Sequence, residues 1–236
     1  MGNLLSTTLI ISFISPIIGS FLGIIKKPKP NIIAHLFAFS AGIMISISFL
    51  DLIPQSLEYG LLSSCIYGLI IGSLIIYLID LLFKNNGCDN DSTKKLSLLL
   101  AASMGFHNIC EGMAVAIGSM LDEKLSFVII ASIAIHNIAE GVCTATPLYY
   151  SYKNKFISFF VSSLTAFPLL IGYLLVYCFF RNSSPLFFSF LLSITAGIMI
   201  YISCSELIPY STQSSHTSIY SLILGIVLVL LLQNIA

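Results

Sequence analysis

The sequence contains very few charged residues. Only 8% of its 236 residues are Asp, Glu, Lys or Arg, whereas 57% are hydrophobic, and the mean hydropathy is +1.01. Soluble domains average about 25% charged residues, so this chain lacks the side chains needed to cover a water-exposed surface. The scarcity of charge excludes a soluble globular protein and predicts an integral membrane protein.

Several familiar sequence signals are also absent. The chain lacks the short alternating segments that are typical of a membrane β-barrel. Its six cysteines are scattered and form no C-x-x-C pair, so they indicate no disulfide framework. It contains no G-x-x-x-x-G-K-S/T loop, which argues against ATP-driven transport by this chain alone. Because the first apolar run has no basic leader, we expect a membrane span there and not a cleaved signal peptide.

What the chain has instead is a series of apolar runs long enough to cross a bilayer. A hydrocarbon core of about 30 Å needs about 20 helical residues. These runs fill most of the sequence, so residues 1–236 are predicted to form one transmembrane domain of the all-α class. We predict eight membrane-spanning helices, at about residues 4–25, 32–54, 61–83, 96–120, 125–148, 156–180, 186–209 and 217–235.

The basic residues predict the orientation of these spans. Eight of the ten Lys and Arg residues fall in the loops after the first, third and fifth spans, whereas Lys124 and Arg181 fall on the other side. Because positively charged loops stay in the cytoplasm, both termini are predicted to lie outside. The eight cytoplasmic residues would be Lys26, Lys27, Lys29, Lys84, Lys94, Lys95, Lys153 and Lys155.

Two copies of one segment occur in spans that run in opposite directions. The stretch AGIMISISFLDLIP at 41–54 aligns with AGIMIYISCSELIP at 196–209, with ten of fourteen positions identical. Asp51 of the first copy aligns with Glu206 of the second. The second span is predicted to run outward and the seventh inward, so the repeat has inverted topology. Inverted repeats are typical of transporters, in which the substrate binds near the middle of the membrane.

A second pair of similar segments lies between these copies. HNICEG occupies residues 107–112 in the fourth span, and HNIAEG occupies residues 136–141 in the fifth, again in opposite directions. Pro16 in the first span and Pro168 in the sixth indicate a third, weaker pair. The pairs predict an inverted-repeat bundle of three, two and three helices, with the polar motifs in its central pair.

The polar side chains of the central motifs suit a metal ion. In each motif the histidine and the glutamate are four residues apart and share one helix face, and the asparagine lies about 100° around the helix. Imidazole nitrogens with carboxylate and amide oxygens suit a divalent transition metal such as zinc or iron. The alternative role, hydrogen bonding between helices, is less suited to two matched copies. The six predicted ligands are His107, Asn108, Glu111, His136, Asn137 and Glu140.

Three further residues have two alternative roles each. Asp51, near the outer end of its span, and Glu206, near the inner end of its span, are predicted either to handle the ion at the two mouths of a pathway or to be charges at helix ends. Cys143 lies three residues after Glu140 on the same face. A thiolate there would favour softer metals, whereas simple packing is the more common role for a buried cysteine.

These motifs resemble those of a known family. The two HN-x-x-EG segments, PLYY at 147–150 and SELIP at 205–209 resemble the ZIP (Zrt/Irt-like) metal transporters, and most of all the bacterial zinc-uptake branch. The resemblance covers nearly the whole chain. It implies uptake of Zn(II), often with Fe(II), Mn(II), Co(II) or Cd(II), across a bacterial cell (inner) membrane. It also implies a binuclear centre between the fourth and fifth helices.

The resemblance assigns roles by position, and this chain departs from it in places. The two histidines and two glutamates would frame a first metal, and the two asparagines would share the glutamates at a second. Cys110 and Ala139 stand where the family usually has proline, so the kink and free carbonyl that proline gives a helix are either missing or supplied otherwise. Phe167 stands where the family commonly has a glutamate before Pro168, which removes one ligand of the second metal.

Two functions from other classes are the alternatives to a transporter. An intramembrane zinc hydrolase would use the metal to activate water, but no H-E-x-x-H helix is present. A metal sensor would be expected to carry a soluble output domain, for which no segment remains. We therefore predict a transporter and not an enzyme, with divalent metal ions and the lipid bilayer as partners, no nucleic acid and no prosthetic group. The sequence leaves a homodimer open.

Overall fold

The structure is a computed structural model that describes residues 2–25, 29–85, 92–121, 123–180 and 184–235. Every regular element in these residues is helical, and no β-strand occurs among them, so the all-α prediction is confirmed. The elements are α1 (Gly2–Ile25), α2 (Pro30–Ile47), η1 (Ser48–Leu52), α3 (Ile53–Tyr59), α4 (Leu62–Asn85), α5 (Ser92–Leu121), α6 (Glu123–Tyr152), α7 (Lys155–Leu164), α8 (Phe167–Leu175), η2 (Val176–Phe180), α9 (Pro185–Ile202), η3 (Ser203–Leu207), α10 (Ile208–Ser214) and α11 (Ser218–Ile235), where η marks a π-helical segment.

The outside of the bundle is apolar. Large hydrophobic side chains such as Phe156 and Phe179 are 75% exposed, which suits lipid and not water. Shorter apolar helices cover Leu9–Ile25 and Ser218–Leu231. Within the described residues, four helical stretches are long and apolar enough to cross a membrane: Asn31–Tyr59, Leu62–Ile79, Lys155–Phe179 and Pro185–Ser214.

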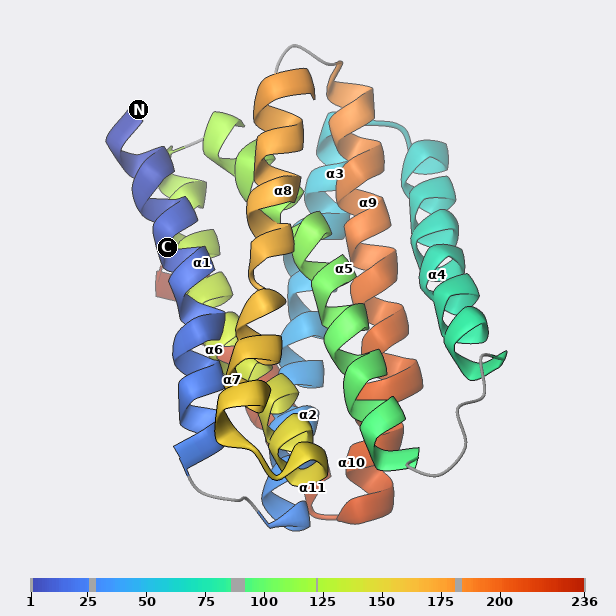
Figure 1. The fold of residues 1–236 in the computed structure, drawn as a ribbon. Coiled ribbons are helices and arrows are strands. Elements are labelled where there is room, and N and C mark those ends of the chain that lie inside the picture. The colour runs from blue at the N-terminus through green and yellow to red at the C-terminus, as the bar shows by residue number, and fades with distance from the viewer. Residues whose placement is uncertain (1, 26–28, 86–91, 122, 181–183, 236) are drawn as a thin grey trace.

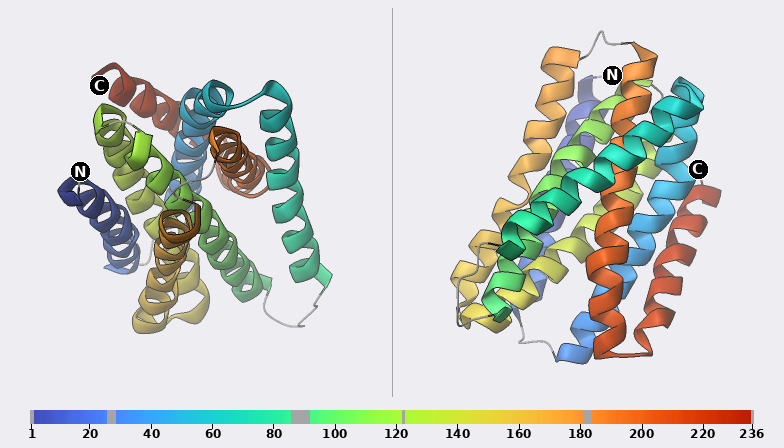
Figure 2. Two further views of the ribbon diagram at one scale, coloured as in Figure 1. Left: turned by 90° about the horizontal axis from the view of Figure 1, so that it is seen from above. Right: turned by 90° about the vertical axis from the view of Figure 1, so that its right-hand side faces the viewer.

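The long helices run side by side, with α5 and α6 in the middle of the bundle (Figure 1). These two helices contact each other, and each also contacts helices on both sides. α5 packs on α8 and α9, and α6 packs on α1 and α2. By contrast, α4 lies at the periphery against α9 (Figure 2). The central position of α5 and α6 shields the HN-x-x-EG motifs from lipid.

Each copy of the AGIM segment is followed by a π-helical turn. In η1 the N–H of Ile53 donates to the carbonyl of Ser48, five residues back, and η3 repeats this pattern. Pro54 is then the second residue of α3, and Pro209 holds the same place in α10, where the missing N–H costs least. The helices therefore continue beyond the two prolines, at which we expected the spans to end.

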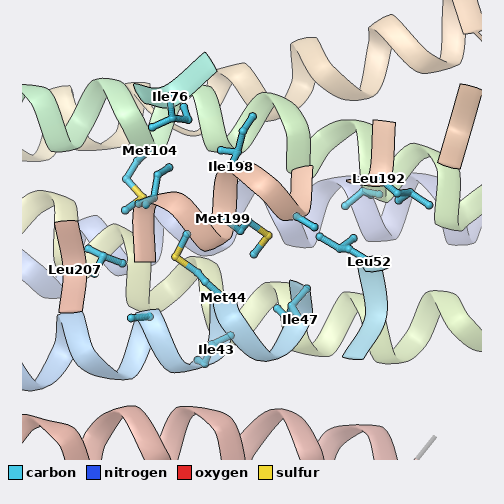
Figure 3. Packing of buried hydrophobic residues seen from close by; sticks show 14 of the residues in the cluster. Ile43, Met44, Ile47, Leu52, Ile76, Met104, Leu192, Ile198, Met199 and Leu207 are labelled. Atoms are coloured by element: carbon cyan, nitrogen blue, oxygen red, sulfur yellow. The ribbon is translucent and has the colours of Figure 1, made fainter. Parts of the chain in front are cut away.

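The buried core contains residues from both copies of this segment. Met44 of α2 and Met199 of α9 are equivalent in the two copies, and both are buried in one cluster together with Met104 of α5 (Figure 3). The similarity of the two segments in sequence is thus matched by equivalent places in the core.

Backbones approach closely in four helix pairs, which are α1 with α6, α5 with α8, α4 with α9 and α2 with α11. Glycine permits this approach in each pair. A Cβ atom on Gly42 of α2 would collide with the carbonyl oxygen of Leu222 in α11, and one on Gly225 of α11 would collide with that of Phe39. Small residues at helix contacts are the usual means of packing in membranes.

Replacing Gly42 by Ala is expected to lower the free energy of unfolding by about 1–3 kcal/mol, because the added methyl group meets backbone and not a flexible side chain. Gly105→Ala is the matched control. A Cβ atom there would lie 3.8 Å from Pro168 Cγ, and alanine is the better helix former by about 1 kcal/mol. Thermal unfolding of the detergent-solubilised proteins measures the stability of both variants. Equal stability of the two variants would contradict the packing account.

Candidate metal centre

The two HN-x-x-EG motifs lie midway along the central helices. His107 and Glu111 belong to α5, and His136 and Glu140 belong to α6. All four side chains are at most 5% exposed. The spacing of four residues puts each histidine and its glutamate on one face, and the contact of α5 with α6 brings the two faces together.

Three of these side chains meet at one point. Glu140 Oε1 lies 3.0 Å from His107 Nε2 and 2.9 Å from His136 Nε2. The two Nε2 atoms are 3.3 Å apart, and the imidazole planes make an angle of 80°. Ligands bound about 2.1 Å from a zinc ion are roughly 3.4 Å apart at tetrahedral angles. The three atoms are therefore close to the separations that one bound ion requires.

Glu111 adds a second buried carboxylate. Within the described residues its oxygens make no hydrogen bond of 3.5 Å or less, although the amide group of Asn137 lies near enough to interact with the carboxylate. Its ionisable neighbours are His136, Glu140 and His107. Buried charges are normally paired or bound to a metal, so this arrangement suits an incoming cation. Together with Glu140 it offers two negative charges to a divalent ion.

The motif asparagines bind the backbone of neighbouring helices. Asn108 Nδ2 donates to the carbonyl of Thr165 at 2.6 Å, and Asn137 Nδ2 donates to the carbonyl of Ser12 at 3.2 Å. The Oδ1 atoms of both asparagines are buried and have no hydrogen-bond partner in the described part of the chain. Each asparagine therefore retains one oxygen that can accept a further bond, and Asn137 lies next to Glu111.

The departures from the family pattern have visible consequences. Phe167 is 50% exposed, and its ring packs edge-on against Phe13 with centroids 5.4 Å apart, so that position supplies no ligand. α6 passes through Ala139 without a break. The side chain of Cys110 lies outside the described part of the structure.

The remaining predicted residues are not members of the three-ligand cluster, although Cys143 lies near Glu140. Asp51 and Glu206, both partly buried, occupy the π turns η1 and η3, a type of turn that is frequent at functional sites. Asp51 accepts a hydrogen bond of 2.8 Å from Gln233 Nε2, a partner that the sequence did not indicate. Cys143 is buried with its Sγ 3.6 Å from Ser40 Oγ.

Comparison with known proteins adds an independent finding. Residues 84–233 match a family model described as the ZIP zinc transporter. The chain is 36% identical to the zinc transporter ZupT of Chlorobium limicola, with 90% of each chain covered. It is 35% identical to ZupT of Chlorobium luteolum, with 88% of each covered. It is 30% identical to ZupT of Stenotrophomonas maltophilia, with 88% of this chain and 86% of the relative covered.

Proposed function

The chain belongs to the ZIP zinc transporter family, and from this premise we propose that it carries zinc into the cytoplasm through a site built from the HN-x-x-EG motifs. It is an integral membrane protein and a transporter of divalent metal, not an enzyme. Zinc is the cargo, and the relatives named above are zinc transporters. Fe(II), Mn(II), Co(II) and Cd(II) are proposed as further cargo.

The observation that carries the proposal is the meeting of His107, His136 and Glu140 in the buried centre of the bundle. Their ligand atoms lie within 4.8 Å of one another. Two nitrogens and a carboxylate oxygen are ligands that zinc accepts readily, and Glu111 supplies the second negative charge. A zinc ion that loses its water here would exchange it for these ligands.

A second cargo position is proposed beside the first. Asn108 and Asn137 would contribute their Oδ1 atoms, and the two glutamates would be shared between the positions. The exposure of Phe167 supports a weaker second position, because no carboxylate stands there. Cys143, buried beside Ser40, is proposed to line the path next to Glu140, with packing as its other role.

The proposed membrane topology has eight spans in an arrangement of three, two and three, with both termini outside and residues 1–236 forming one domain. The two AGIM copies occupy equivalent places in the core and in the packing of helices, which supports the inverted repeat. Of the basic residues behind the orientation, Lys26, Lys27 and Arg181 lie outside the described residues. A homodimer also stays a proposal.

Uptake by the purified protein in liposomes tests the proposed function. We expect zinc to accumulate above the level of protein-free liposomes and to saturate with concentration, and we expect the other four metals to compete. A protein that moves no metal would contradict transport. Cleavage of a peptide or lipid in place of metal uptake would favour the hydrolase alternative.

Neutralising the acids of both π turns, Asp51→Asn with Glu206→Gln, is expected to slow zinc uptake about tenfold. Acids at the ends of a pathway raise the local concentration of cations and the rate at which they arrive. Initial rates at low zinc concentration and low salt measure the effect. Glu58→Gln, an exposed acid of α3, is the matched control. If the double variant took up zinc at an unchanged rate, both acids would be only charges at helix ends, with no role in the pathway.

A further inference from the structure

Pro16 interrupts the hydrogen bonding of α1 beside the motif of α6. Proline has no N–H, so the carbonyl of Ser12, four residues earlier, has no donor within its own helix. Asn137 Nδ2 supplies that donor at 3.2 Å. The carbonyl of Pro16 itself faces Gly141, where a Cβ atom would collide with it. The motif of α6 thus contacts α1 at two backbone carbonyls, those of Ser12 and Pro16.

The motif of α5 meets a break of another kind between α7 and α8, where the missing N–H of Pro168 would have faced Leu164 and not Thr165. Pro168 is the second residue of α8, and the N–H of Leu169 donates to the carbonyl of Ala166 at 3.2 Å. A regular helix would instead send this N–H to Thr165. The carbonyl of Thr165 is therefore left for Asn108, whose Nδ2 donates to it at 2.6 Å.

We propose that Pro16 is a positioning residue for the cargo, because it frees the backbone carbonyl of Ser12, which orients the motif asparagine Asn137. The inference rests on the proposed function of the site. A carboxamide is planar, with its N–H₂ group and its oxygen on opposite sides. When Nδ2 is fixed on a carbonyl, Oδ1 must point the other way. A released amide could turn over and present its N–H₂ group, which cannot bind a cation.

The burial of the asparagines supports this role. Asn108 and Asn137 are at most 1% exposed, and their Oδ1 atoms have no partner within the described residues. A side chain that served only to join helices would be expected to use its buried oxygen as well as its nitrogen. Cys110 and Ala139 stand where the family resemblance predicts proline, and here a proline that frees a carbonyl, Pro16, stands in the facing helix α1.

Pro16→Ala is expected to raise the apparent KM for zinc uptake into liposomes about tenfold, the effect of releasing one buried hydrogen-bonded group. Alanine restores an N–H that can bond to Ser12, so Asn137 loses its acceptor. In an Asn137→Ala background the same change should add less than about twofold, because the group it acts through is gone.

The crossed combination provides the control. Pro16→Ala with Asn108→Ala should show effects that multiply, since the carbonyl freed by Pro16 accepts from Asn137 and not from Asn108. A general disturbance of the fold would affect both asparagine backgrounds equally. Gel filtration and helical circular dichroism check folding, and Pro16→Gly, which also restores the N–H, replaces Pro16→Ala if the latter fails to fold.

Multiplying effects with both Asn137→Ala and Asn108→Ala would overturn the positioning role while leaving the metal site intact. This result is distinguishable from failure of the proposed function, which a Glu140→Gln variant reports. If Glu140→Gln took up zinc at the wild-type rate, the site itself would be wrong and the positioning role would fall with it.

Discussion

Glu140→Gln is expected to lower zinc uptake by more than about 100-fold. Loss of a group that merely orients a metal ligand already costs about 10–100-fold, and Glu140 Oε1 is the atom that both histidines approach, at 3.0 and 2.9 Å. Glutamine keeps the shape of the side chain but removes the charge that would offset a divalent cation. Initial rates of uptake into liposomes, at zinc concentrations below and above saturation, measure the loss.

Glu58→Gln makes the same chemical change at an exposed position of α3 and is expected to leave uptake unchanged. The comparison separates the loss of a ligand from the loss of one negative charge on the protein. A Glu140→Gln protein that took up zinc within a few-fold of the Glu58→Gln protein would exclude Glu140 as a ligand.

Glu111→Met is expected to abolish uptake and at the same time to stabilise the metal-free protein. The carboxylate of Glu111 is buried and makes no hydrogen bond of 3.5 Å or less among the described residues, and such a group costs about 1–3 kcal/mol. Methionine has a similar length and no polar group. The expected gain in the free energy of unfolding corresponds to a rise in Tm of roughly 2–12 °C. Thermal unfolding in detergent with a chelator present measures it.

Glu140→Met is the matched control for stability. Glu140 contacts the Nε2 atoms of His107 and His136, so its removal leaves two buried imidazoles without the carboxylate that they face. We therefore expect loss of uptake in both variants but a higher Tm in Glu111→Met alone. A lower Tm for Glu111→Met would mean that its carboxylate is stabilised in the metal-free protein.

Much of the site could be predicted because its information is local in the sequence. The spacing of four residues between His107 and Glu111, and between His136 and Glu140, determines which side chains share a helix face. The low charge of the chain determines that these faces must be buried. Together they predicted the four side chains, of which the structure brings three into contact and places Glu111 beside them.

The partners of the asparagines could not be predicted in the same way. Which carbonyl accepts from Asn108 depends on which helix packs against α5, and apolar periodicity is the same for every possible neighbour. The π turn at Pro54 and the break after Thr165 were missed for a related reason. Their uniformly apolar surroundings do not distinguish an i+4 hydrogen bond from an i+5 or i+3 bond. Pro16 indicated a free carbonyl in the first span, but the side chain that bonds to this carbonyl depended on which helix faces it.

The close glycine contacts also set the order in which the protein can assemble during synthesis. Gly42 packs against the backbone of Leu222, a residue that the ribosome reaches 180 positions later. At about 5–20 residues per second, α2 waits roughly 10–35 s in the membrane for α11. During this interval its glycine face is covered only by lipid or by a temporary protein partner. Packing of α2 against α11 can therefore begin only when α11 has left the ribosome.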